Sequence, residues 1–317
     1  MNRSLLLTLV SLTAVLAGCS KQPSEPAIRL AYVPYSSSVP AIVASERGLF
    51  TSRGLVVELR RIESSNEAMS ALANGEVDGV MGIGLASLLA VEAKSPGSFR
   101  MSWYAVEDDQ NWVNAVLVPI SSTANSIQDL RGKTIGTFTG ATQVMNLRAA
   151  FVKALGSAEA IKVAQIAPNL QLQALERKEF DGLFTIEPTV TLAISRGLAR
   201  VLVDNLRCQF ILNPFPAGGG VLSTKLVSAR PKVASSLVEA FDEAIQFARR
   251  DPGAAKALLP KYISIEPDIA AKSRLYSWWT SSEVQAQSLQ AVSDLLSTER
   301  ILTSKVDVRS FLFANAK

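Results

Sequence analysis

The segment Thr139-Gly140-Ala141-Thr142 combines residue types that can hold an anionic or strongly accepting group. It follows "KTIGTF", which predicts a strand, and precedes "QVMNLRAAFVKAL", which has the spacing of a helix. Unpaired N–H groups at a helix N-terminus favour negative charge, and Gly140 would let a ligand approach the backbone closely. Thr139 and Thr142 add hydroxyl donors, although threonine at this position also caps helices. We therefore predict a ligand contact here, and capping is compatible with it.

A second polar segment, "PYSSSVP", follows the strand predicted at residues 28–33. Tyr35 would supply an aromatic wall, and Ser36 and Ser38 would supply hydroxyl donors. The alternative is an exposed turn, because serine is common in turns. Both interpretations stay open on the sequence alone.

Two more loops lie at predicted strand ends in the first part of the chain. Ser64, Ser65 and Asn66 follow the strand predicted at residues 55–62 and begin a helix, so they can cap that helix and contact a ligand. Gly84 ends the apolar run "VMGIG" and opens the loop toward the next helix. Ligands collect outside the carboxyl ends of strands in open parallel sheets, so these loops are candidate site loops.

Glu187 and Trp112 complete the set of candidate ligand contacts. Glu187 stands at a predicted strand end, directly before Pro188. As a ligand contact it would select an amine or another donor, and as a structural residue it would cap a neighbouring backbone. Trp112 lies where the chain is expected to cross between two lobes, which places it near a cleft.

The composition excludes several kinds of site. The chain has 317 residues, a net charge of +4 and no histidine, so Ser-His-Asp and Cys-His catalysis are excluded. We predict no catalytic residues, no metal site and no cofactor. Lysine and arginine are dispersed, which argues against a nucleic-acid partner.

The first residues predict an export signal and a lipid anchor. An apolar run of thirteen residues, Leu5 to Ala17, is followed by Gly18 and Cys19, so that the segment ends in "LAGC". At 1.5 Å per residue it cannot cross a hydrocarbon core of about 30 Å, so it is a signal segment. Cys19 resembles the acylated cysteine of a bacterial lipobox. We expect a signal peptide at residues 1–18, a polar tether at 19–26, and a protein held to a membrane of the periplasm or cell envelope.

One phrase of the sequence occurs twice. "ALANGEVDGVMGIG" (71–84) and "ALERKEFDGLFTIE" (174–187) share Ala-Leu at the start and Asp-Gly at the eighth and ninth positions. The same order of strands and helices surrounds both. Alternating strands and helices are typical of parallel sheets covered by helices. The pattern predicts two similar α/β lobes, and we assign Asp78 and Asp181 to turns.

The sequence pattern of the C-terminal third predicts helices without a sheet of their own. "PKVASSLVEAFDEAIQFARR" carries an apolar stripe, and similar segments continue through "RSFLF". We expect these helices to cover the first lobe, which makes it discontinuous. The predicted boundaries are 27–114 plus 219–317 for lobe I and 115–218 for lobe II.

Four stretches together resemble a known family. They are "VPYSSSVPAIVASERGLFTSRGLVVEL", "ALANGEVDGVMGIG", "DLRGKTIGTFTGAT" and "FDGLFTIEP". Their order and spacing are similar to those of the periplasmic substrate-binding proteins of ABC importers for nitrate, sulfonates, taurine and thiamine-precursor pyrimidines. Thr185 departs from the pattern, because relatives often carry a bulky aromatic residue before Glu-Pro.

The resemblance implies a fold and a function. The fold would be the type II periplasmic-binding-protein fold, α/β with two lobes, each a mostly parallel sheet flanked by helices, with the ligand in the cleft between them. The function would be capture of a small polar organic ligand, anionic or aromatic and sulfonate- or pyrimidine-like, and its delivery to an ABC permease and its ATPase. We expect a monomer and no enzyme.

Two other functions stay open. The same binding fold can pass its signal to a sensor. It also serves a pyrimidine synthase of thiamine biosynthesis, but that enzyme uses histidine and iron, and this chain has no histidine.

Overall fold

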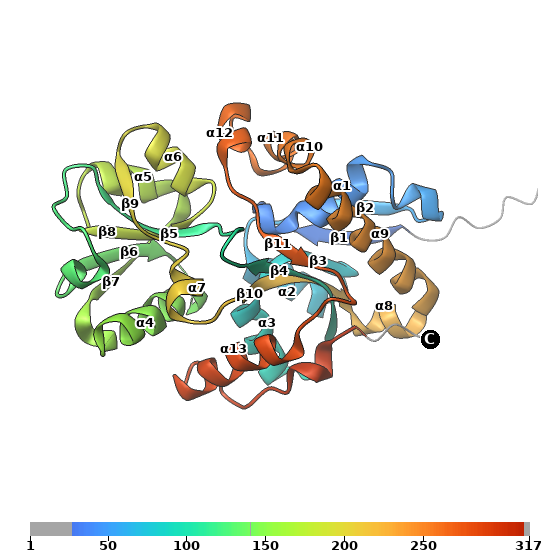
Figure 1. Ribbon diagram of the computed structural model, residues 1–317. Helices are drawn as coiled ribbons and strands as arrows, with labels where there is room; N and C mark the ends of the chain where they lie inside the picture. Colours follow the sequence, from blue (N-terminus) through green and yellow to red (C-terminus); the bar gives the residue numbers. More distant parts are fainter. Residues whose placement is uncertain (1–26, 140, 314–317) are drawn as a thin grey trace, which may run out of the picture.

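The computed structural model describes residues 27–139 and 141–313, which form two lobes side by side (Figure 1). We call the lobe around the six-stranded sheet, with strand order β11-β4-β10-β3-β1-β2, the first lobe. The second lobe surrounds the five-stranded sheet, with order β7-β6-β8-β5-β9. The predicted two-lobed α/β architecture is confirmed.

The strands are β1 (Ile28–Tyr32), β2 (Val57–Arg61), β3 (Gly79–Gly84), β4 (Phe99–Glu107), β5 (Asn114–Pro119), β6 (Thr134–Phe138), β7 (Lys162–Ile166), β8 (Gly182–Ile186), β9 (Ala199–Asp204), β10 (Phe215–Ser223) and β11 (Ser277–Trp279). The helices are α1 (Val39–Glu46), α2 (Ser65–Ala73), α3 (Leu85–Lys94), α4 (Ala141–Leu155), α5 (Gln171–Glu176), α6 (Thr189–Ser195), α7 (Leu206–Phe210), α8 (Thr224–Ala229), α9 (Pro231–Arg250), α10 (Pro252–Ala257), α11 (Leu259–Ile263), α12 (Pro267–Lys272) and α13 (Ala286–Thr298). Short 3₁₀ helices lie at Ser36–Ser38, Thr51–Arg53, Ile127–Leu130, Ala158–Ala160, Pro168–Leu170 and Val308–Phe311.

Both sheets are mixed, whereas the sequence predicted mostly parallel sheets. β1 pairs in parallel with β2 and β3, and β6 does so with β7 and β8. β10 runs antiparallel to β3 and β4, and β5 runs antiparallel to β8 and β9. The reversal follows from topology, because β5 and β10 are the strands through which the chain enters each sheet from the other lobe.

The repeated phrase is a repeated structural step from a helix to a strand. In the first lobe, the Asp78 carboxylate accepts a hydrogen bond of 2.8 Å from the backbone N–H of Arg29 in β1. In the second lobe, the Asp181 carboxylate accepts one of 2.9 Å from the backbone N–H of Thr134 in β6. Gly75 and Lys178 end the two helices with positive φ angles of 73° and 56°. The two aspartates therefore fasten equivalent turns to equivalent strands.

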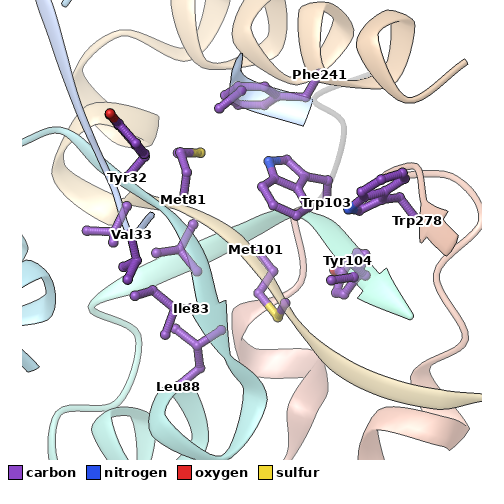
Figure 2. Packing of buried hydrophobic residues seen from close by; sticks show 14 of the residues in the cluster. Tyr32, Val33, Met81, Ile83, Leu88, Met101, Trp103, Tyr104, Phe241 and Trp278 are labelled. Carbon is purple, nitrogen blue, oxygen red and sulfur yellow. The ribbon is translucent and has the colours of Figure 1, made fainter. Parts of the chain in front are cut away.

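The core of the first lobe lies on both faces of its sheet. Figure 2 shows Met101 and Trp103 of β4 between Phe241 of α9 on one side and Leu88 of α3 on the other. The Phe241 ring lies edge-on to those of Phe50, at 5.7 Å, and Trp103, at 6.5 Å. Helix α9, in the C-terminal third of the chain, therefore packs on the first lobe.

The second lobe has one apolar cluster on each face of its sheet. Phe151 and Leu147 of α4 pack with Phe184 of β8 in one cluster. Leu175 of α5 and Val190 of α6 pack with Leu183 of β8 in the other. Successive residues of a strand point to opposite faces, so β8 contributes Leu183 and Phe184 to different clusters.

The glycines of "NPFPAGGGV" belong to a central strand, although the sequence indicated a break there followed by a strand at "GVLST". β10 begins at Phe215, before the predicted boundary at Gly219. A Cβ atom on Gly218 would lie 2.0 Å from the Ile83 carbonyl oxygen, and one on Gly219 would lie 2.1 Å from that of Trp103. Only glycine allows β10 to approach both neighbours this closely.

Gly218→Ala is expected to destabilise the protein by about 1–3 kcal/mol or more, because the added methyl group must push β10 away from β3. The measurement is the free energy of unfolding by chemical denaturation. Gly253→Ala is the control, since its Cβ would meet Asp251 at an ordinary 3.5 Å. Equal stability of the two variants would contradict the close packing of β10.

Candidate functional site

A buried carboxylate holds together the two segments that cross between the lobes. Glu107 is the last residue of β4 and is fully buried. It accepts hydrogen bonds from the backbone N–H of Val113, at 3.0 Å, and from Asn114 Nδ2, at 2.9 Å. Its other oxygen lies 3.0 Å from Nε of Arg207, which is also buried. The first crossing segment is thereby fixed to α7, which precedes the second.

Two asparagines bond to the first crossing segment, one directly after β9 and one in the second crossing segment. Asn205 Nδ2 donates to the carbonyl oxygen of Asp108, at 2.9 Å. Asn213 Nδ2 donates to Asp109, at 2.7 Å. The Arg207 guanidinium lies 5.3 Å from the Phe215 ring centre, at the start of β10. The lobes therefore meet at a well-bonded junction instead of two independent linkers.

A narrow crevice lies between the lobes beside this junction. The first lobe contributes Leu85 and Ala86 of α3, Phe215 and Ala217 of β10, and Val292 of α13; the second lobe contributes Thr142, Met145 and Asn146 of α4. A Cβ atom built on Gly84, the N-cap of α3, would lie 3.9 Å from the Thr142 methyl group. The N-terminal turns of α3 and α4 therefore meet across the crevice.

Part of the predicted Thr139 to Thr142 segment lies at this meeting point. Thr139 is exposed after β6, and Thr142 lines the crevice in the first turn of α4. Gly140 and the side chain of Ala141 lie outside the described residues. Thr142 and Gly84, predicted from separate loops, are thus brought together.

The serines of the first predicted loop are bonded to backbone. Ser38 Oγ donates to the carbonyl oxygen of Val33, at 2.7 Å, and Ser37 Oγ donates to that of Gly82, at 3.1 Å. Ser36 is buried, and Tyr35 packs half-buried against the first-lobe core. Burial raises the pKa of the Tyr35 phenol. These contacts hold the loop against β3, so the exposed-turn alternative is wrong for the serines.

The second predicted loop shows the capping role. Ser64 is the N-cap of α2, and its side chain accepts a hydrogen bond of 3.4 Å from the backbone N–H of Glu67. Ser64 and Asn66 are exposed, and Ser65 is half-buried. None of the three lines the crevice between the lobes as the structure describes it.

Glu187 accepts hydrogen bonds from both lobes. Its carboxylate accepts from the Thr191 backbone N–H and hydroxyl, at 3.1 and 3.0 Å, and from the Arg274 backbone N–H, at 3.2 Å. Burial raises the pKa of this carboxyl group. The Arg274 guanidinium lies 3.9 Å from the Trp112 ring centre. Glu187 and Trp112 thus lie together at a second contact between the lobes, and the hydrogen bonds of Glu187 are of the kind expected from its structural alternative.

Thr185 hydrogen-bonds within the second lobe. Its hydroxyl donates to Gln171 Oε1, at 2.7 Å, and both side chains are buried. The position where relatives often carry a bulky aromatic residue is therefore occupied here by one member of a polar pair between β8 and α5.

Sequence reasoning missed three buried polar residues at the junction and crevice. Glu107, Arg207 and Asn146 are each at most 2 % exposed. Asn146 stands four residues after Thr142 on α4, and that helical spacing was the available signal. Glu107 and Arg207 are distant in the sequence, and no pattern pointed to their pairing.

The crevice offers hydrogen bonds and apolar contact, with no charged side chain among the residues described there. Within residues 27–139 and 141–313, no group of three or more Cys, Asp or Glu residues could hold a metal ion. In the same part of the chain, no helix has the length and apolar character needed to span a membrane. A larger surface depression near Lys133 and Asp181 lies away from the crevice, at the other end of the five-stranded sheet.

Comparison with known proteins agrees with this architecture. A Brucella abortus protein whose name describes it as a binding protein is 22% identical over 300 residues, which cover 91% of this chain and 90% of that protein. The periplasmic aliphatic sulphonate binding protein SsuA from Escherichia coli superposes with a TM-score of 0.74 at 18% identity, covering 92% of this chain and 93% of that one. The desulfurization enzyme DszB has the same fold, with a TM-score of 0.66 at 17% identity, covering 90% and 96%.

The family model of the NMT1-like family matches residues 21–260, which is more than half of the chain. The stretches that indicated a resemblance to binding proteins of this kind lie within those residues. The chain therefore belongs to the NMT1-like family.

Proposed function

We propose that the protein is a solute-binding protein whose two lobes close on a small polar organic molecule. The observation that carries this proposal is the crevice between α3 and α4, where helix N-termini from different lobes face each other. Helix N-termini present free N–H groups to a ligand, and lobes joined by short crossing segments can close by hinge motion. The name of the SsuA neighbour, a sulphonate binding protein, supports a ligand with a strongly accepting group.

The proposed partners are an ABC permease and its ATPase, to which the protein delivers its ligand. It works in the periplasm or cell envelope as a monomer. Family membership supports this role, and the Escherichia coli neighbour is described as periplasmic. A sensor in place of the permease would leave the binding site unchanged.

Turnover of the ligand is the competing function, because DszB is an enzyme on the same fold. Catalysis on a bound substrate usually requires a nucleophile or a general acid–base group within hydrogen-bond reach. The side chains that line the described crevice are apolar, apart from a threonine hydroxyl and an asparagine amide. This lining supports binding without chemistry.

A thermal-shift screen tests the proposed function. Sulfonates, pyrimidines, amides and small carboxylates would be added to the full chain in mild detergent. A ligand at 100 times its dissociation constant adds about 2.7 kcal/mol of stability and so raises the melting temperature.

Thr142→Ala should weaken binding of the hit by about 1–3 kcal/mol, the cost of an unpaired buried group. Binding equal to wild type would place the site elsewhere.

Cys19 is proposed to carry the lipid anchor, although it lies outside the described residues. The motivation is "LAGC" after a short apolar run. Mass spectrometry of the protein from bacterial membranes should find a chain that starts at Cys19 and carries acyl mass. Cys19→Ser should remain uncleaved or without lipid. A mature chain with another first residue and an unmodified Cys19 would refute the anchor.

A further inference from the structure

The Asn146 side chain is buried in the crevice without a hydrogen-bond partner. Asn146 is 1 % exposed, and neither its Nδ2 nor its Oδ1 has a partner in the described structure. The crevice it lines is narrow, so a ligand enters when the lobes move apart. Buried polar groups nearly always have a partner, so this one requires an explanation.

Stability alone does not explain an asparagine at this position. Its neighbours in the crevice include Leu85, Met145, Phe215 and Val292, which are apolar. A leucine of similar volume would suit these neighbours and would bury no unpaired group. Thr142 stands one turn earlier on the same face of α4 and lines the same crevice. The Asn146 amide lowers stability and stands beside Thr142, a candidate ligand contact. We therefore infer that the amide recognises the ligand.

The unpaired atoms define what a ligand must bring. Asn146 Oδ1 needs a donor, and Asn146 Nδ2 needs an acceptor. The N-terminal turns of α3 and α4 supply only donors, so a ligand group with acceptors alone would leave Asn146 Oδ1 unsatisfied. The ligand must therefore carry a hydrogen-bond donor as well as an acceptor.

The charge of the crevice narrows the ligand class further. The eight residues that line it are uncharged. Arg207, a buried cation whose guanidinium lies over the Phe215 ring, is already paired with Glu107. No lining side chain therefore offers a counter-charge to an ammonium group, and only the N–H groups of the two helix N-termini would balance a full anion.

We propose that Asn146 is a specificity-determining ligand contact that recognises a neutral amide or lactam edge, with N–H and C=O side by side. The inference rests on the proposed function and names its ligand class. The Asn146 amide and such an edge form two reciprocal hydrogen bonds. Closure on this ligand satisfies the amide, whereas closure on an acceptor-only molecule leaves Oδ1 unpaired, so Asn146 also favours closure on the matching ligand.

Ligand-observed NMR titration of the full chain in mild detergent tests this proposal with a matched pair of probes. 2-Pyrrolidinone has the amide edge, and N-methyl-2-pyrrolidinone lacks only its N–H. Ethanesulfonate serves as an anionic probe with acceptors alone. Wild type should bind 2-pyrrolidinone at least tenfold more tightly than either of the others. Asn146→Leu should abolish that preference.

The free protein supplies a second readout. Asn146→Leu should melt at the same temperature as wild type or a few degrees higher, because it removes a buried unpaired amide. The control Asn125→Leu changes an exposed asparagine of the same lobe and should leave binding unchanged. A lower melting temperature of Asn146→Leu would show that the amide is a structural residue and would overturn the proposal.

The remaining outcomes separate this proposal from the proposed function. Tight binding of ethanesulfonate that Asn146→Leu leaves unchanged would overturn the amide-edge ligand while the solute-binding function stands. If wild type binds none of these probes and the thermal-shift screen gives no hit, both proposals are overturned. A hit without an amide edge overturns this one alone.

Discussion

Arg207→Met is expected to lower the free energy of unfolding by about 3–5 kcal/mol, the usual cost of removing one partner of a buried ion pair. The substitution leaves the Glu107 carboxylate fully buried without its counter-charge. Glu107 cannot move to solvent, because it also accepts hydrogen bonds from Val113 and Asn114. Chemical denaturation followed by circular dichroism measures the loss.

A double variant separates charge from packing. Glu107→Gln combined with Arg207→Met keeps an oxygen for the donors of Val113 and Asn114 and removes both charges. It should recover most of the stability that Arg207→Met loses, since the penalty comes from the unpaired charge. A double variant no more stable than Arg207→Met alone would mean that the guanidinium acts through its packing on Phe215.

Phe241→Ala is expected to cost about 3–5 kcal/mol, as for other large-to-small changes in well-packed cores. The ring is fully buried, and it contacts Phe50 and Trp103 from helix α9. This decrease in the free energy of unfolding measures how much the packing of α9 on the first lobe stabilises the protein. The free energy of unfolding measures it, and Leu170→Ala, at a side chain that is 45% exposed, is the control with an expected change within about 0.5 kcal/mol.

Hydrogen exchange on the same variant tests the proposed discontinuous first lobe. If α9 and the strands of residues 28–107 form one unit, Phe241→Ala should speed exchange in β3 and β4 as well as in α9. Faster exchange confined to residues 231–250 would show that α9 is an independent attachment. The lobe would then not depend on its C-terminal part.

Local patterns predicted most of the fold. The helix-turn-strand step around Asp78 and Asp181 could be predicted from the sequence, because equivalent hydrogen bonds to the backbone require the same residues in both lobes. β10 was misread in part, because glycines that usually mark a break here permit close approach of β3 and β4. Only the neighbouring strands reveal that reason, and they are far away in the sequence.

The candidate site was less predictable than the fold. Gly84 was proposed from its place at a strand end and Thr142 from its place between a strand and a helix, and the structure brings them together. Ser38 and Glu187 looked like donors and acceptors for a ligand, but Ser38 bonds to the backbone, and Glu187 bonds to two backbone N–H groups and the Thr191 hydroxyl. Asn146 looked like an ordinary residue of a helical run. Its burial and lack of partners depend on α3 and β10 of the other lobe.

The most direct test of the central claim is native mass spectrometry of the full chain, released from mild detergent, with pooled small polar compounds. Each pool is quantified before and after incubation with the protein. A solute-binding protein should retain one molecule of one compound per chain, and the total amount of every compound should stay constant. Conversion of a compound to a new mass would contradict binding without chemistry. So would pools in which no compound forms a one-to-one complex.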